Sequence, residues 1–280
     1  MKLKLTALAV LLAASTSMHA ALVDYQAGDL VLSVYAKGGV GSTVNVSVGL
    51  GDLATAFRDG ALGGSSYWTS SSSDSWTFNT NLGATLTAQF GANWQSRTDL
   101  YWGVTGVLTS SVSAPAVNGD PRRTVYVSHA VGATPEVLSG AEVGNVATYM
   151  AGFQSDLAAR QADAGQTLIV TYSDTANNSY EYWMAGSPRT NSFNDWGYFN
   201  TAANLSSAVT LERYLALTTG ANPSGTTGVG STIGTFSFDS NGNLTFQAVP
   251  EPSTVGLFAA TALGLGFLLW KRRRSAAAAV

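Results

Sequence analysis

The chain has 280 residues, no cysteine and only 11% charged residues, which excludes disulfides, thiol catalysis, cysteine-ligated metals and acylation on cysteine. Residues 21–249 hold 16 acidic and 8 basic side chains, a formal charge of −8. This balance disfavours nucleic acid as a partner, because phosphate binding requires clustered cations. The same segment is long enough for one large β domain or two small ones.

The N-terminus has the pattern of a secretory signal peptide. Two lysines precede the apolar run 5–14, and small residues then lead to a cleavage site, which we place after Ala20 with Ala21 as the alternative. No stop-transfer pattern follows at once. We therefore expect residues 1–20 to be removed and residues 21–248 to form an extracytoplasmic domain.

This domain has the sequence pattern of a series of strands. Short segments are rich in β-branched and aromatic residues, and many alternate apolar with polar side chains, as in Thr124–Ser128. Asn118-Gly119, Asn177-Asn178 and Asn241-Gly242 favour the positive φ of tight turns. We predict an all-β fold, an antiparallel β-sandwich or jelly roll. The predicted strands are residues 30–35, 43–48, 85–90, 100–108, 124–131, 167–172, 179–184, 209–217, 235–238 and 243–247.

Helix and loop signals are limited. One short helix is predicted over Asp156–Ala164, with Ser155 as its N-cap and Gly165 as its stop. Two low-complexity stretches predict loops: the serine-rich Gly63–Ser75, and the Gly/Thr/Ser-rich Ala221–Ser231 before the final hairpin.

Residues suited to catalysis are few. His129 is the one histidine after the predicted signal peptide, and without a G-x-S-x-G elbow in the chain its favoured role is structural. Asp174 and Glu181 flank a predicted hairpin as a candidate glycosidase pair, although an acidic surface also brings carboxylates together by chance. Asp239–Asn243 is similar to a calcium loop, but the early position of its glycine favours a hairpin turn. We predict no catalytic residue, no metal site and no cofactor.

Six tryptophans lie before the C-terminal apolar segment, and indole faces stack well on sugars. Trp68 and Trp196 are flanked by polar residues and are the candidate glycan contacts, whereas Trp102 and Trp183 lie in strand-like runs. A large β domain without disulfides needs bulky core side chains. Packing is therefore the favoured role for the group as a whole.

The C-terminal segment has the pattern of a membrane anchor. The uncharged run Val255–Trp270, counted with or without Ser253 and Thr254, gives roughly 24–27 Å of helix at about 1.5 Å per residue, close to the ~30 Å hydrocarbon core. We place the transmembrane helix at about 254–270, with a short tail at 275–280. A basic stop between the helix and the tail keeps the C-terminal side of the helix in the cytoplasm, so we expect the domain to lie outside. The stop consists of Lys271, Arg272, Arg273 and Arg274.

Pro250, Glu251 and Pro252 come directly before this predicted helix. The two prolines favour an extended backbone, which a protease or transpeptidase cleft requires, and Glu251 suits a basic group on such an enzyme. Together, the tripeptide, the helix and the arginine cluster resemble the PEP-CTERM protein-sorting signal over residues 249–274. The hairpin-like segment 233–246 is also similar to one often found before that signal.

The resemblance implies a substrate of exosortase, a multi-spanning membrane protease-transpeptidase of Gram-negative bacteria that make exopolysaccharide. It implies anchoring in the inner membrane with the domain outside, cleavage near the tripeptide, and delivery to the cell surface or beyond. We expect a non-enzymatic surface or matrix protein associated with exopolysaccharide or biofilm. The first alternative is a carbohydrate-binding module that uses exposed tryptophans. A glycoside-active enzyme is the less favoured alternative.

Overall fold

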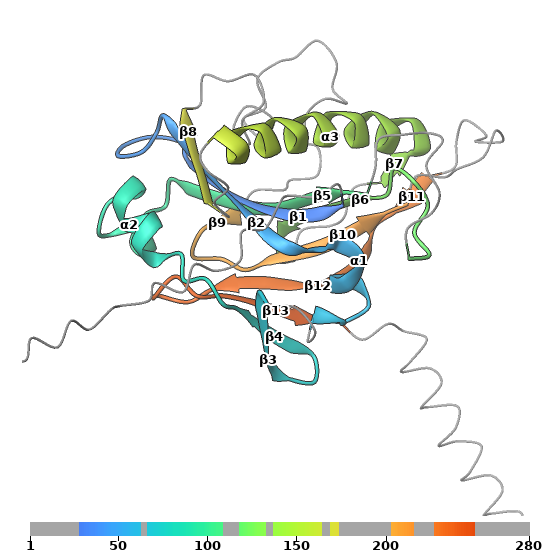
Figure 1. The fold of residues 1–280 in the computed structure, drawn as a ribbon, viewed down its shortest axis with the longest axis horizontal. Helices are drawn as coiled ribbons and strands as arrows, with labels where there is room; N and C mark the ends of the chain where they lie inside the picture. The colour runs from blue at the N-terminus through green and yellow to red at the C-terminus, as the bar shows by residue number, and fades with distance from the viewer. Residues whose placement is uncertain are drawn as a thin grey trace, which may run out of the picture.

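The structure, a computed structural model, describes residues 28–62, 66–108, 118–132, 137–163, 169–173, 203–215 and 227–249. Within these residues the chain is mostly β, with one large antiparallel sheet and a separate strand pair of β7 (Val137–Ser139) with β11 (Thr227–Val229). One long helix covers the sheet and short helices lie at its two ends (Figure 1). The prediction of an antiparallel β fold is confirmed.

The strands of the large sheet are β1 (Asp29–Ala36), β2 (Val44–Leu53), β3 (Trp68–Ser72), β4 (Ser75–Phe78), β5 (Leu100–Val107), β6 (Val125–Ala130), β8 (Ile169–Ser173), β9 (Ala203–Asn204), β10 (Val209–Tyr214), β12 (Ser231–Phe238) and β13 (Leu244–Ala248). Their order is β3-β4-β13-β12-β10-β6-β5-β1-β2-β8, and β9 pairs with β5 beside this path. In place of the two separate sheets of a sandwich, one continuous sheet curls over a shared core (Figure 1).

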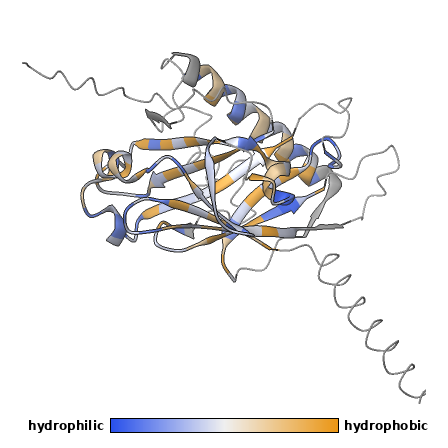
Figure 2. Ribbon diagram, turned by 60° about the horizontal axis from the view of Figure 1, so that its bottom comes forward, coloured by the Kyte–Doolittle hydropathy of each residue, from blue (hydrophilic) through white to orange (hydrophobic). Residues whose placement is uncertain are grey.

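Side-chain alternation along the strands creates a core on each face of this sheet. In β1, Leu30, Leu32 and Val34 point into the core enclosed by the curl, whereas Val31 and Tyr35 join the cluster beneath helix α3 (Gly140–Asp163). All eight residues of β1 are buried, because both faces are covered. Figure 2 shows the resulting alternation of apolar and polar residues along the strands.

The core inside the curl is aromatic. Phe57 of helix α1 (Ala54–Arg58) lies 5.3 Å from Trp68, 5.6 Å from Phe236 and 5.2 Å from Phe246, measured between ring centroids. These rings come from α1 and β3 near the start of the domain and from β12 and β13 at its end. One cluster therefore joins the first and last described parts of the chain. Buried aromatic area of this kind supplies much of the stability that a chain without disulfides requires.

Helix α3 is longer than predicted. The sequence signals place a helix only at Asp156–Ala164, but α3 begins at Gly140 and ends at Asp163. The glycines and β-branched residues of its first half lower helix propensity and conceal the pattern. The three-and-four spacing of its buried stripe is nevertheless present in the sequence. The stripe consists of Val143, Val146, Ala147, Met150, Phe153 and Leu157.

The predicted strand 85–90 is wrong, because it forms most of helix α2 (Gly83–Phe90). Its two buried side chains, Leu86 and Phe90, are four residues apart, the spacing of one helix face. The alternating threonines have high β propensity, but burial of these two side chains decides the conformation.

Both predicted loops contain strands. The serine-rich stretch 63–75 includes β3 and the start of β4, and the stretch 221–231 includes β11 and the start of β12. In β3, Trp68 is buried while the four following residues are exposed, because β3 is an edge strand of the sheet. Polar residues are therefore compatible with strand structure here.

Two of the three predicted tight turns are confirmed. Asn118 and Gly119 have φ of 47° and 86°, and Gly242, between β12 and β13, has φ of 83°. The third, Asn177-Asn178, lies outside the described residues, as does the predicted strand 179–184.

Helices suited to crossing a bilayer do not occur among the residues that the structure describes. The predicted signal peptide, its cleavage site at Ala20 or Ala21, and the predicted span 254–270 all lie outside those residues.

Candidate functional site

Strand β13 carries the chain from the core of the domain to the predicted sorting segment. Leu244 and Phe246 are fully buried, and the aromatic ring of Phe246 lies 4.7 Å from that of Phe236. The strand is also paired along both of its edges, with β12 on one side and β4 on the other. The segment before the motif is thus an interior strand, held by side chains and backbone alike.

Backbone hydrogen bonds continue to the last described residue. The Ala248 N–H donates to the Asp74 carbonyl at 2.8 Å, and the Val249 N–H donates to the Ile233 carbonyl at 2.9 Å. Pro250 follows directly in the sequence. No spacer therefore separates the folded domain from the Pro-Glu-Pro tripeptide.

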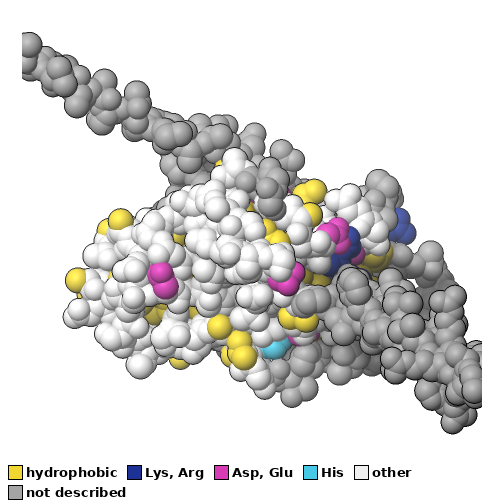
Figure 3. Space-filling view, turned by 90° about the horizontal axis from the view of Figure 1, so that it is seen from below, with side chains coloured by type: hydrophobic (Ala, Val, Ile, Leu, Met, Phe, Trp, Pro, Cys, Tyr) yellow, Lys and Arg dark blue, Asp and Glu magenta, His cyan; other side chains and the backbone are white. Residues whose placement is uncertain are grey.

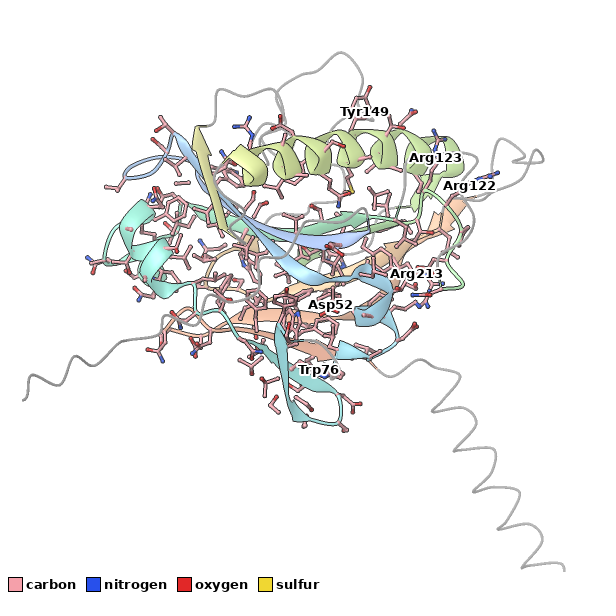
Figure 4. The ribbon with its side chains drawn as sticks, in the orientation of Figure 1. Asp52, Trp76, Arg122, Arg123, Tyr149 and Arg213 are labelled. Atoms are coloured by element: carbon pink, nitrogen blue, oxygen red, sulfur yellow. The ribbon has the colours of Figure 1, made fainter. Side chains whose placement is uncertain are left out.

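We name the end of the sheet where the chain leaves β13 the exit end. It contains Val249, the β3–β4 turn (Ser73–Asp74), the start of β12 and helix α1. Arg122, Arg123 and Arg213 lie at the same end (Figure 4). Helix α2 and the β12–β13 turn lie at the opposite end, where the Asn81 amide donates to the Asn241 carbonyl (Figure 1).

The remaining predicted sorting residues lie outside the described part of the chain. They are the recognition residues Pro250, Glu251 and Pro252 and the membrane stop Lys271, Arg272, Arg273 and Arg274.

Trp68 does not have the exposed indole that its polar neighbours predict. Only 2% of this residue is exposed, and its ring packs 5.1 Å from Phe78 and 5.3 Å from Phe57. Its Nε1 donates a hydrogen bond to the Leu50 carbonyl at 2.9 Å. A buried indole offers no face to a sugar, so the prediction of glycan contact by Trp68 is wrong.

The other described tryptophans are core residues as well. Trp76, Trp94 and Trp102 are at most 3% exposed, and Trp102 donates from Nε1 to the Ser207 carbonyl at 3.0 Å. The core role predicted for Trp102 is confirmed. Trp183 and the second candidate glycan contact, Trp196, lie outside the described residues, as do Asp174 and Glu181.

His129 and Glu212 form a buried pair between β6 and β10. The imidazole Nε2 lies 3.1 Å from Glu212 Oε1, and Nδ1 lies 2.8 Å from the Ala130 carbonyl oxygen. A carbonyl and an ionised carboxylate both accept, so this arrangement favours the imidazolium form, in which both ring nitrogens donate. The Thr232 hydroxyl donates to the same Oε1 at 2.9 Å, which puts the carboxylate between hydroxyl and imidazole. A catalytic triad has the imidazole in the middle, so this geometry supports a structural role for His129.

This pair predicts a pH-dependent stability. The hydrogen bond to Glu212 raises the pKa of His129 above its usual 6.5 in the folded state. The stabilisation of the folded state by the His129–Glu212 pair is therefore complete below about pH 6.5 and is lost as pH rises through the raised pKa of His129. We expect the free energy of unfolding, measured with urea at a series of pH values, to fall over that interval.

The matched variant for this measurement is His129→Gln, which removes the titrating group. Since His19 lies in the predicted signal peptide, the variant should show no fall in that interval. An unchanged pH profile in the variant contradicts the assignment.

A second buried ionic cluster joins α1 to β6. Asp120 is 1% exposed and accepts hydrogen bonds from the Arg58 guanidinium and the Tyr126 hydroxyl, while Arg213 Nε lies 3.7 Å from its carboxylate. Hydrogen bonding to Asp59 and the charge of Asp120 raise the pKa of Arg58, and burial followed by the bond to Asp120 raises the pKa of Tyr126. Arg58 and Asp120 are 62 positions apart, and no local sequence pattern signals their contact.

The segment Asp239–Asn243 is a hairpin turn, as predicted. Asp239 Oδ1 accepts the N–H groups of Asn241 at 2.8 Å and Asn243 at 2.9 Å, and its Oδ2 accepts the Asn243 side-chain amide at 2.7 Å. The carboxylate is thus used by the turn itself. Nowhere in the described residues do three potential His, Asp or Glu ligands gather around a metal position.

Comparison with known proteins identifies the C-terminal segment of the chain. Neither curated proteins nor solved structures give a significant match, so no relative supplies an activity for the β domain. Among protein families, residues 248–274 match the PEP-CTERM protein-sorting motif, and the match begins at the last residue of β13. The chain therefore carries a PEP-CTERM protein-sorting motif and is an exported protein that is sorted to the cell surface through its C-terminus.

Proposed function

We propose that an exosortase-type enzyme processes this protein at Pro250-Glu251-Pro252 while the segment 254–270 holds it in the inner membrane of a Gram-negative bacterium. The observation that carries the proposal is the sorting-motif match at residues 248–274, which begins at the last residue of β13. The exported domain then reaches the cell surface or the extracellular matrix.

The proposed role of the exported domain is non-enzymatic association with exopolysaccharide or biofilm. Its excess of acidic over basic side chains, with few charges in total, suits a soluble protein in polysaccharide-rich surroundings. Figure 3 shows a face on which acidic and hydrophobic side chains appear only as small, separate groups among backbone and other side chains. The engagement of His129 with Glu212 and of Asp120 with Arg58 also supports a structural use of these groups.

Replacing Glu251 with alanine tests the processing step. The tripeptide loses its charge but keeps both prolines, so we expect the full-length form to accumulate in the membrane fraction and surface delivery to stop. Immunoblotting of fractionated cells measures both quantities. The processed wild-type protein should be recovered with the extracellular polysaccharide.

Ser253→Ala is the control, because it alters a neighbouring residue and leaves the tripeptide intact; it should be processed normally. Normal size and delivery of the Glu251→Ala protein would contradict recognition of the tripeptide. Complete separation of the processed wild-type protein from polysaccharide on washing would contradict the matrix role alone.

A further inference from the structure

The position of the sorting motif is tied to the exit end. Ala248 and Val249 are both fixed by backbone hydrogen bonds, to Asp74 and Ile233 respectively. A chain whose last residues were free of the sheet would place the motif over a wide range of positions. Here only the residues that follow Val249 determine how far the motif can lie from the sheet.

Chain geometry limits that range. A residue extends the backbone by at most about 3.6 Å, so Pro252 lies within about 11 Å of Val249 in any conformation. Thr254, where we place the start of the membrane span, lies within about 18 Å by the same limit. An enzyme that holds the tripeptide in its cleft at the membrane surface must therefore come close to the exit end.

We propose that the exit end is a docking surface for the membrane-embedded processing enzyme. This inference rests on the processing proposed above, and it assigns to the folded domain a contact that the sorting motif does not specify. The surface includes the exposed β3–β4 turn, Ser73 and Asp74, and Asp59 at the end of α1, whose side chain is 43% exposed. Polar side chains of this kind suit a transient contact, because permanent interfaces are more apolar.

The opposite end of the sheet provides the natural comparison. The β12–β13 turn, with Ser240 exposed at its tip, is separated from Val249 by the length of β13, about 17 Å at about 3.3 Å per residue. Ser73 and Ser240 are thus two exposed serines on hairpin turns that border the same strand at its opposite ends.

The test is the rate of processing in the full-length chain, expressed with its exosortase-type enzyme and followed by pulse-chase labelling. Ser73→Trp places a bulky side chain at the exit end and should slow conversion several-fold. Ser240→Trp should be converted at the wild-type rate. Insertion of a flexible Gly/Ser linker between Val249 and Pro250 should restore the rate of Ser73→Trp, because the domain then lies farther from the cleft.

Each outcome is decisive. A wild-type rate for Ser73→Trp, or slow conversion that the linker leaves unchanged, overturns the docking surface. Ser72→Trp, on the same hairpin, repeats the test if Ser73→Trp loses the native circular dichroism spectrum. A wild-type chain that is never processed contradicts the proposed function instead, so the two failures are distinguishable.

Discussion

Replacing Asp120 with alanine is expected to lower the free energy of unfolding by about 3 kcal/mol. The carboxylate is 1% exposed and accepts hydrogen bonds from Arg58, whose side chain is 9% exposed, and from the fully buried Tyr126 hydroxyl. Its removal leaves both donors without this buried acceptor. A buried hydroxyl without its acceptor, and a cation that among the described residues keeps only the half-exposed Asp59 as its counter-ion, cost more than the intact interaction contributes.

Asp59→Ala is the matched control for this variant. Asp59 binds the same guanidinium at 2.6 Å, but its side chain is 43% exposed, so its loss should cost about 0–1 kcal/mol. Urea unfolding monitored by circular dichroism measures both variants. Equal losses of stability in the two variants would contradict the idea that the burial of a carboxylate, and not its ion pair with Arg58, determines how much its removal destabilises the fold.

Replacing Phe246 with alanine is expected to be at least as destabilising, at about 3–5 kcal/mol. Phe246 is fully buried in β13, and its ring centroid lies 4.7 Å from Phe236, 5.2 Å from Phe57 and 6.1 Å from Trp76. The truncation opens a cavity where α1, β4 and β12 meet. Heat or urea unfolding monitored by tryptophan fluorescence measures the loss.

Gln247→Ala is the control beside it, since Gln247 is exposed on the same strand and should change stability by at most about 0.5 kcal/mol. A Phe246→Ala protein with wild-type stability would show that the aromatic cluster repacks without loss.

The predictions from sequence succeeded where the signal was local. Alternation in Thr124–Ser128 marks β6 because neighbouring side chains on a strand point to opposite faces. The same rule fails at residues 85–90, where the buried spacing is helical. In Gly63–Ser75 the serines suggested a loop, because composition alone does not distinguish an exposed edge strand from a turn.

In the candidate site too, the part with a local sequence signal was predicted and the part that depends on the fold was not. The tripeptide and its basic stop lie in one short segment, residues 250–274, and the PEP-CTERM motif match confirms the resemblance that they carry. The exit end was not predictable, because Asp74, Ile233 and Ala248 meet only through the order of the strands. Trp68 was assigned wrongly for a related reason: its burial depends on Phe57 and Phe78, which the flanking serines do not reveal.

The place of β13 within the sheet has a consequence for the timing of export. Strand β4 pairs with β3 and with β13, so within the described residues the strand pairing of the β3–β4 hairpin with the rest of the sheet runs through β13. If the chain is exported unfolded and N-terminus first, the residues of β13 are among the last of the described domain to cross, because they end at Ala248. Until they arrive, β4 and β12 each lack the neighbour that β13 provides, so we expect the sheet to be completed only after the chain has crossed as far as the start of the sorting motif.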